Sequence, residues 1–174
     1  MLICICLCVS LALAVTNALT ANRIKELEEQ AEQDALRTVI PDCEYTEGQN
    51  GDISYYIASS GDEIKGYIFV VTGKGYGGDI TVMTAVKDAT VLGVAIVDVS
   101  SETTGLGQRA EEPEFYGQFT GLTEGIGVNK NVPGSNEIKA ITGATITSKA
   151  VTEAVNTALG YAKEIEGGAN GGEQ

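Results

Sequence analysis

The N-terminal 22 residues constrain this chain most, because they contain no charged side chain. The stretch MLICICLCVSLALAVTNALTAN consists mainly of Leu, Ile, Val, Ala and Cys, and the first charge is Arg23. As a helix it would extend about 33 Å, which matches a bilayer hydrocarbon core of roughly 30 Å. We therefore expect a single transmembrane anchor over residues 1–22.

A cleaved signal peptide is the alternative interpretation of this stretch. Such peptides begin with a basic region, and no Lys or Arg precedes the apolar run. A lipoprotein signal needs a small residue before its cysteine, whereas Cys4, Cys6 and Cys8 follow Ile or Leu. An uncleaved anchor fits better, and its orientation is only weakly determined by Arg23 and Lys25.

The lack of histidine limits the chemistry that this sequence can support. It excludes a Ser-His or Cys-His nucleophile, a His general base, axial His ligation of haem and His-containing zinc sites. We therefore predict no catalytic residue and no metal site, and expect carboxylates, hydroxyls, backbone dipoles or an organic cofactor to carry any chemistry. The formal charge of -13 also makes nucleic acid an unsuitable partner, because phosphate backbones bind Lys and Arg.

Residues 23–41 predict a helical stalk that continues the anchor until Pro41 stops it. An antiparallel meander follows, built from four segments rich in Val, Ile, Tyr and Phe. These segments are 52–59, 63–73, 80–86 and 91–99. The sequence GKGYGG between the second and third segments has glycines and a lysine, as a phosphate-binding loop would. It lacks the Walker spacing and leads into no helix, so a wide turn between strands is the better interpretation.

The C-terminal part of the chain predicts helices on the sheet. Residues 101–119 form a loop and a short helical piece, whose buried side consists of Phe115, Tyr116 and Phe119. Residues 120–138 form a glycine-rich connection. Apolar residues at helical spacing predict a helix from about Ser148 to Lys163.

The predicted fold class is therefore α+β. A single transmembrane helix precedes one soluble domain, residues 42–166, which contains an antiparallel sheet and flanking helices. The Gly, Asn and Glu tail over residues 167–174 is expected to be disordered.

Four hydroxyl residues surround one Gly-Ala pair in AITGATITSKAV, which runs from Ala140 to Val151. They are Thr142, Thr145, Thr147 and Ser148. Thr147 or Ser148 is expected to cap the helix that follows. The unpaired N–H groups at such a helix start bind phosphate, which would place Thr145 at the edge of a phosphate-binding pocket. Taken alone, these residues favour the simpler interpretation of a hydroxyl-rich cap.

ITGATITS resembles the (S/T)-G-A-T flavinylation motif of the FMN-binding domain family. That family includes the G subunit of Rnf complexes and the C subunit of sodium-pumping NADH:quinone reductases. SETTGLGQRAEEPEFYGQF resembles the family's E-T-P-G-L-G segment, with Thr104 in place of the usual proline. GKGYGGDITVM and the anchor with its stalk are also similar to the G subunit. One position departs from the family pattern, because Lys139 stands where an acidic residue usually begins the attachment motif.

The resemblance implies that Thr145 carries FMN through a phosphoester bond. It also implies contacts from the loop Glu102–Gly107, and we expect Thr104, Gly105 and Leu106 to touch the flavin. Glu102 either contacts the flavin or bonds to backbone N–H groups. The predicted cofactor-binding set is completed by Thr142, Gly143, Ala144 and Thr147, with Thr142 and Thr147 mainly orienting the loop.

The function implied by the resemblance is electron transfer within a membrane-bound Rnf-type ferredoxin:NAD oxidoreductase complex that translocates sodium ions or protons. The chain would relay electrons between neighbouring subunits without a substrate of its own. It would need a flavin transferase for maturation and would hold its domain on the extracytoplasmic side of the cell membrane. Two alternatives stay open: a membrane-anchored scaffolding module without flavin, and an FMN-binding carrier of another respiratory chain.

Overall fold

The computed structural model describes residues 1–169 and contains two compact units that divide after Asp34. Apart from Met1, the first unit is helical and belongs to α1 (Leu2–Val39), whose last residues lie in the second unit. Among the described residues, α1 is the one helix long and apolar enough to cross a membrane, and its apolar window is fully exposed. This finding rests on length and composition.

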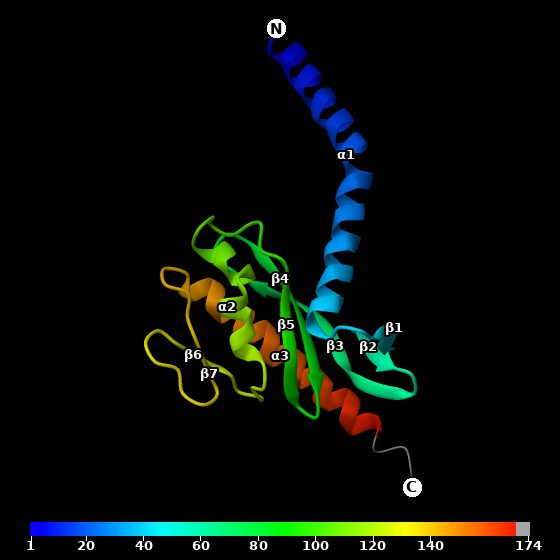
Figure 1. Ribbon diagram of the computed structural model, residues 1–174. Helices are drawn as coiled ribbons and strands as arrows, with labels where there is room; N and C mark the ends of the chain where they lie inside the picture. Colours follow the sequence, from blue (N-terminus) through cyan, green and yellow to red (C-terminus); the bar gives the residue numbers. More distant parts are fainter. Residues whose placement is uncertain (170–174) are drawn as a thin grey trace. The chain divides into compact units, whose positions relative to one another are not determined.

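The second unit is built on a five-stranded sheet in which neighbours along the chain pair antiparallel (Figure 1). The strands are β1 (Glu44–Asn50), β2 (Ile53–Ser60), β3 (Glu63–Lys74), β4 (Asp79–Lys87) and β5 (Thr90–Asp98). The predicted meander is confirmed for β2 to β5. The sequence does not predict β1, because EYTEGQN is polar and glycine-containing. It is an edge strand, paired along its whole length with β2 and largely exposed.

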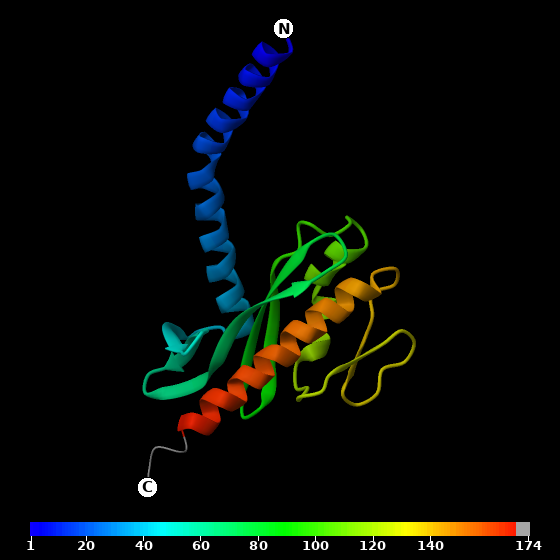
Figure 2. The same ribbon diagram turned by 180° about the vertical axis from the view of Figure 1, so that it is seen from behind.

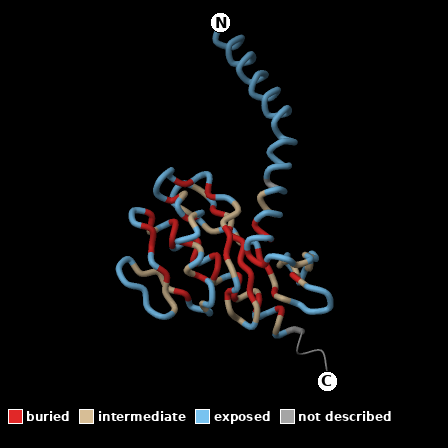
Figure 3. The backbone as a smooth tube through the Cα atoms, viewed as in Figure 1, coloured by how far each residue is buried: buried red, intermediate tan, exposed pale blue. Residues whose placement is uncertain are grey.

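Both faces of the sheet are covered, which explains why β4 is buried without a break from Val82 to Val86. On one face Val82 and Val86 belong to a core that includes Val151 and Leu159. On the other face Met83 and Ala85 belong to a second core with the residues that end α1. These are Ala35, Leu36 and Val39, and Ile40 directly after the helix also belongs to this core. Figure 3 shows the buried residues concentrated in the strands and in the elements that cover them.

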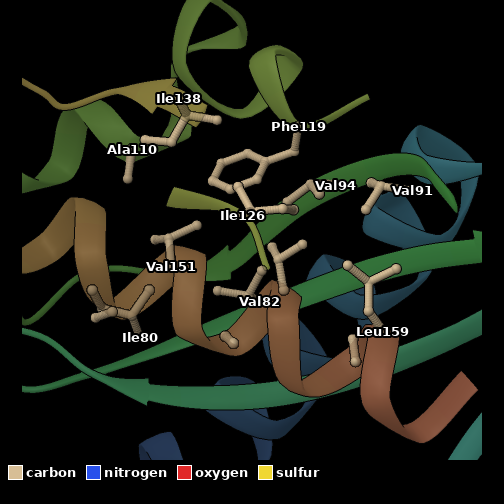
Figure 4. Packing of buried hydrophobic residues seen from close by; sticks show 14 of the residues in the cluster. Ile80, Val82, Val91, Val94, Ala110, Phe119, Ile126, Ile138, Val151 and Leu159 are labelled. Atoms are coloured by element: carbon tan, nitrogen blue, oxygen red, sulfur yellow. The ribbon is translucent and has the colours of Figure 1, made fainter. Parts of the chain in front are cut away.

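The segment between β5 and the last helix folds onto the first core in short pieces. Its elements are η1 (Gly107–Glu111), α2 (Pro113–Tyr116), η2 (Gly117–Phe119), β6 (Gly127–Asn129) and β7 (Glu137–Lys139). The predicted short helical piece is present, with Phe115 and Phe119 buried edge to face at 5.8 Å between ring centroids and Tyr116 half-buried. Figure 4 shows side chains from this segment, β4, β5 and the last helix meeting in one core.

The parallel pairing of β6 with β7 was not expected from the glycine-rich sequence of residues 120–138. Side-chain amides hold this region where apolar periodicity is lacking. Asn156 accepts hydrogen bonds from the N–H groups of Gly125 and Ile126, at 3.2 and 3.0 Å. Asn136 donates to the carbonyl oxygens of Thr123 and Glu124.

The last helix, α3 (Thr145–Ala169), lies along one face of the sheet, as Figures 1 and 2 show from opposite sides. Its predicted apolar stripe is buried in the first core. The helix is longer than predicted at both ends. Residues 167–169 of the predicted tail are helical, and residues 170–174 lie outside the described part of the chain. Burial of Ile165 and a hydrogen bond from the Asp88 N–H to Glu166 Oε1 (3.0 Å) support this C-terminal extension.

Candidate functional site: a pocket at the start of the last helix

A tight turn at Gly143 starts α3. Gly143 has a φ of 82°, which L side chains rarely adopt, and the next N–H, that of Ala144, donates to Ile141 O at 3.0 Å. The first helical hydrogen bond then runs from the Ser148 N–H to Ala144 O, also at 3.0 Å. Ala144 therefore occupies the N-cap position. The prediction that Thr147 or Ser148 caps the helix is wrong, because the turn lets the helix begin earlier.

The four hydroxyl groups of this segment fall into two pairs. Thr147 and Ser148 are 1% and 0% exposed and hydrogen-bonded: Thr147 Oγ1 donates to Glu102 Oε2 at 2.6 Å, and Ser148 Oγ donates to Ala144 O at 2.9 Å. Thr142 is exposed and Thr145 is half-buried. Within the described part of the chain neither of these two hydroxyls has a hydrogen-bond partner. Only Thr142 and Thr145 are thus available for other chemistry.

Thr145 lines a pocket of about 420 Å³, which we call the helix-end pocket. Its volume lies within the range of small-molecule sites, roughly 300–1,000 Å³. The lining residues are Tyr76, Glu102, Thr103, Leu106, Gly107, Gly143, Ala144, Thr145, Ile146 and Thr147. Tyr76, Leu106 and Ile146 are 73%, 43% and 52% exposed, so aromatic and aliphatic surface is available to a ligand here.

The same wall carries the N-terminus of α3. The N–H groups of Thr145, Ile146 and Thr147 precede the first helical hydrogen bond and have no carbonyl partner one turn earlier. Together with the helix dipole they favour an anion. The pocket therefore combines an anion-binding end with an apolar side.

Glu102 connects three segments at this pocket, although its side chain is only 4% exposed. Its Oε1 accepts a hydrogen bond from the Gly77 N–H at 2.7 Å, and its Oε2 accepts the bond from Thr147 Oγ1. The GKGYGG sequence is a turn between β3 and β4, as predicted, closed by a hydrogen bond from the Gly75 N–H to Gly78 O at 2.9 Å. Glu102 thereby joins this turn to the start of α3.

Glycines make room for the carboxylate. A Cβ at Gly75 or at Gly107 would lie less than 3.0 Å from a carboxylate oxygen of Glu102. A Cβ at Gly77 would meet the Ser101 carbonyl oxygen at a similarly impossible distance. These glycines are required by close approach, because any side chain would displace the carboxylate or its loop.

Burial raises the pKa of the Glu102 carboxyl, but hydrogen bonds to its ionised form outweigh that effect. The donors are the Thr147 hydroxyl and the backbone N–H groups of Gly77, Tyr76 and Gly78. The pKa of Glu102 therefore lies below its ordinary value of 4.5, and the group is charged at neutral pH. Of the two roles considered for Glu102, bonding to backbone N–H groups is present in the structure.

The structure brings most of the predicted site residues to the helix-end pocket. Glu102, Leu106, Gly143, Ala144, Thr145 and Thr147 line it. Thr104 and Gly105 are exposed in the adjacent loop and are not among the lining residues. Sequence reasoning missed Tyr76 and Ile146, whereas Thr103 and Gly107 belong to the loop Glu102–Gly107 from which contacts were expected. An exposed tyrosine between glycines in GKGYGG was the available signal for Tyr76.

Thr142 lines a different pocket, also of about 420 Å³, which we call the charged pocket. Its lining residues are Arg109, Glu112, Glu114, Phe115, Gln118, Lys139, Ala140, Ile141 and Thr142. Lys139 is exposed there, while its backbone N–H donates to Gln118 Oε1 at 2.8 Å. The backbone before the Gly143 turn is thus held independently of the Lys139 side chain.

Residues 75–160 match the model of the FMN-binding domain family. This range contains the whole lining of the helix-end pocket. The fold and the site thus define an FMN-binding-domain protein.

Comparison with curated relatives shows to which family within this class the chain belongs. The chain is 34% identical to the G subunit of the proton-translocating ferredoxin:NAD(+) oxidoreductase complex of Clostridium ljungdahlii, over 90% of this chain and 85% of that one. It is 38% identical to the G subunit of the Na(+)-translocating complex of Acetobacterium woodii, over 84% and 81%. The G subunit of an ion-translocating oxidoreductase complex from Methanosarcina acetivorans is 31% identical, over 89% and 87%. The chain belongs to this family of G subunits.

Two solved structures share the fold. The C subunit of the Na(+)-translocating NADH-quinone reductase from Parabacteroides distasonis is 28% identical with a TM-score of 0.54, over 64% of this chain and 61% of that one. NqrC of Shewanella oneidensis is 17% identical with a TM-score of 0.54, over 71% of this chain and 66% of that one. At this low identity the likeness shows a shared fold and nothing about function. The chain spans less than two thirds of each of these proteins. The predicted α+β class with an antiparallel sheet is confirmed.

Proposed function

We propose that this chain is the FMN-carrying electron-transfer subunit of a membrane-bound, ion-translocating ferredoxin:NAD oxidoreductase complex of the Rnf type. We propose further that FMN is bound covalently, through a phosphoester to Thr145. The observation that carries this proposal is the position of Thr145. Of the two available hydroxyls in the attachment segment, it is the one on the helix-end pocket.

The residues at this pocket fit FMN. The N–H groups of the first turn of α3 suit the phosphate, and the pocket wall carries no Lys or Arg that would compete for it. Tyr76, Leu106 and Ile146 offer aromatic and aliphatic surface to the ring system. When bound, FMN supplies the electron-carrying chemistry that a chain without histidine or a metal-binding cluster among its described residues does not supply itself.

Attachment requires an activated donor. The new bond joins Thr145 Oγ1 to phosphorus, the hydroxyl proton is released, and the broken bond is the phosphoanhydride of a flavin dinucleotide, whose nucleotide half leaves. A flavin transferase would catalyse this exchange. Thr145 is half-buried at the first residue of the helix, so its hydroxyl is accessible to such an enzyme, whereas those of Thr147 and Ser148 are not.

The proposed setting is a complex in the cell membrane. The curated relatives are named as G subunits of ion-translocating complexes, and α1 is long and apolar enough to anchor the chain. Other subunits of the complex would be the electron donor and acceptor. The domain would lie on the extracytoplasmic side, where a covalent bond retains a cofactor that is not readily replaced.

The likeness to the solved NADH-quinone reductase protein favours a second candidate, an FMN carrier of an NADH:quinone reductase. The match to the G subunits extends over more of both chains, which favours the first. Copurification of the native protein with its complex would identify the neighbouring subunits and decide between the two.

The attachment is tested by in-gel fluorescence of the full-length protein after denaturation, from cells that contain a flavin transferase. We expect a fluorescent band for the wild type and for Thr145→Ser, and none for Thr145→Ala. Thr142→Ala is the matched control, because it removes an equally unpaired hydroxyl from the charged pocket. A dark wild-type band would support the flavin-free scaffold, and a dark Thr142→Ala band beside a bright Thr145→Ala band would move the attachment site.

A further inference from the structure

Glu102 is the one carboxylate among the residues that line the helix-end pocket, and that lining contains no Lys or Arg. The side chain is 4% exposed. Water therefore screens its charge poorly, and electrostatic effects on anything in the pocket are stronger than at an exposed surface. An occupant of the pocket would meet a fixed negative charge that no cation on the wall balances.

The carboxylate is held in one position by donors on two sides. Gly77 donates to Oε1 at 2.7 Å and Thr147 to Oε2 at 2.6 Å, and the missing side chains of Gly75 and Gly107 leave the room that the carboxylate occupies. These dipoles stabilise the charge but leave the net charge of the group unchanged. Glu102 is thus both the connection between the β3–β4 turn and α3 and a permanent charge on the wall.

We propose that Glu102 is a positioning residue whose fixed charge also lowers the reduction potential of the flavin. The inference rests on the proposed function, since it requires FMN in this pocket. On reduction a partner redox protein would be oxidised and the ring system would gain its electrons, and with them negative charge, before protons from water follow. A nearby like charge disfavours that gain, so the pocket would make the flavin a stronger reductant than the same pocket without the charge.

The substitution Glu102→Gln removes the negative charge and keeps the size and shape of the side chain. The glutamine carbonyl can accept the Gly77 N–H, and its NH₂ group can donate to the Thr147 hydroxyl, which accepts as well as donates. Redox titration of the purified, flavin-loaded, full-length protein, followed by visible absorbance, should show a shift to more positive potential. Glu137→Gln is the control, because Glu137 also accepts hydrogen bonds from a side chain and from the backbone but does not line the pocket. We expect its potential to equal that of the wild type.

Thr147→Val removes one donor and keeps the carboxylate, so thermal stability should fall while the potential moves much less than in Glu102→Gln. If Glu102→Gln does not load flavin, Ile146→Lys compared with Ile146→Gln tests the same electrostatics at an exposed position on the wall, and the lysine should raise the potential. A flavin-loaded Glu102→Gln or, in its absence, Ile146→Lys variant with the wild-type potential would overturn this inference and leave the proposed function intact. A wild-type protein without covalent flavin would overturn the proposed function itself.

Discussion

The helix-end pocket and the charged pocket have the same volume, about 420 Å³, and consecutive parts of the segment 139–147 line them. Their walls differ. The charged pocket presents Arg109, Glu112, Glu114 and Lys139, whereas the helix-end pocket presents apolar side chains and the start of a 25-residue helix. The two pockets are therefore distinguished by the chemistry of their walls and not by their size. Of the two, the helix-end pocket is the one that we propose for a flavin phosphate together with its ring system.

Among the changes considered, Gly107→Ala should reduce the stability of the protein and its flavin loading most. Its Cβ would lie less than 3.0 Å from two atoms of Glu102, so the variant should lose about 1–3 kcal/mol of unfolding free energy and load less flavin. Gly117→Ala is the control beside the charged pocket, because a Cβ there meets nothing within 4 Å. Thermal unfolding and in-gel flavin fluorescence measure both effects. Equal behaviour of the two variants would contradict the close packing of Gly107 against Glu102.

Gly143→Ala should weaken the boundary between the two pockets. The φ of 82° is strained for alanine by about 1–2 kcal/mol, and the Cβ would meet Leu106 Cδ2 at 3.1 Å. We expect lower stability in chemical denaturation and less covalent flavin per protein. Gly121→Ala, at a φ of 81° with open space around it, is the control for strain alone. Normal flavin loading in Gly143→Ala would show that this turn is not needed for attachment.

Acid should destabilise the helix-end pocket through Glu102. Its pKa is lowered in the folded state, so its contribution to stability is complete above the ordinary value of 4.5 and is lost as the pH falls through the folded value. Melting temperatures measured between neutral and acidic pH should fall more steeply for the wild type than for Glu102→Gln, which has no such proton to bind. Parallel curves would rule out Glu102 as a source of the acid sensitivity.

Changes in the charged pocket should have the smallest effect on the stability of the protein and on its flavin loading. Arg109 pairs with Glu112 at 3.1 Å, and both side chains are 44% exposed, so Arg109→Gln should cost less than about 1 kcal/mol. Lys139→Glu should leave flavin loading at the wild-type level, because Gln118 holds the backbone at this position. Denaturant titration and in-gel fluorescence measure these outcomes. A large rise in flavin loading for Lys139→Glu would show that the transferase reads this side chain.

Local patterns predicted the elements whose signals lie in their own residues. Runs of β-branched and aromatic residues with polar turns predicted β2 to β5, and the apolar stripe predicted α3. The edge strand β1 and the parallel pair of β6 and β7 lack such patterns. Their conformation depends on partners elsewhere in the chain, such as β2 for the first and the Asn136 and Asn156 amides for the connection around the second.

In the candidate site too, local features were predictable from the sequence, and features that depend on distant parts of the chain were not. The hydroxyl cluster, its Gly-Ala pair and the likeness of ITGATITS to a flavin attachment motif are all local, so they were enough to predict Thr145 as the attachment residue. Tyr76 was missed because it reaches the pocket from the turn between β3 and β4, which is far from the hydroxyl cluster in the sequence. The cap was assigned to the wrong residues because helix capping depends on backbone direction, and Gly143 sets that direction.

By itself the sequence determined an apolar helix, an antiparallel meander, an amphipathic C-terminal helix and a cluster of four hydroxyl residues. These depend on short-range periodicity and residue chemistry. Tertiary structure decided which hydroxyls stay available, since burial against Glu102 and the Ile141–Ala144 turn engages Thr147 and Ser148. It also decided that Thr145 and Thr142 line different pockets, because the chain reverses at Gly143 between them.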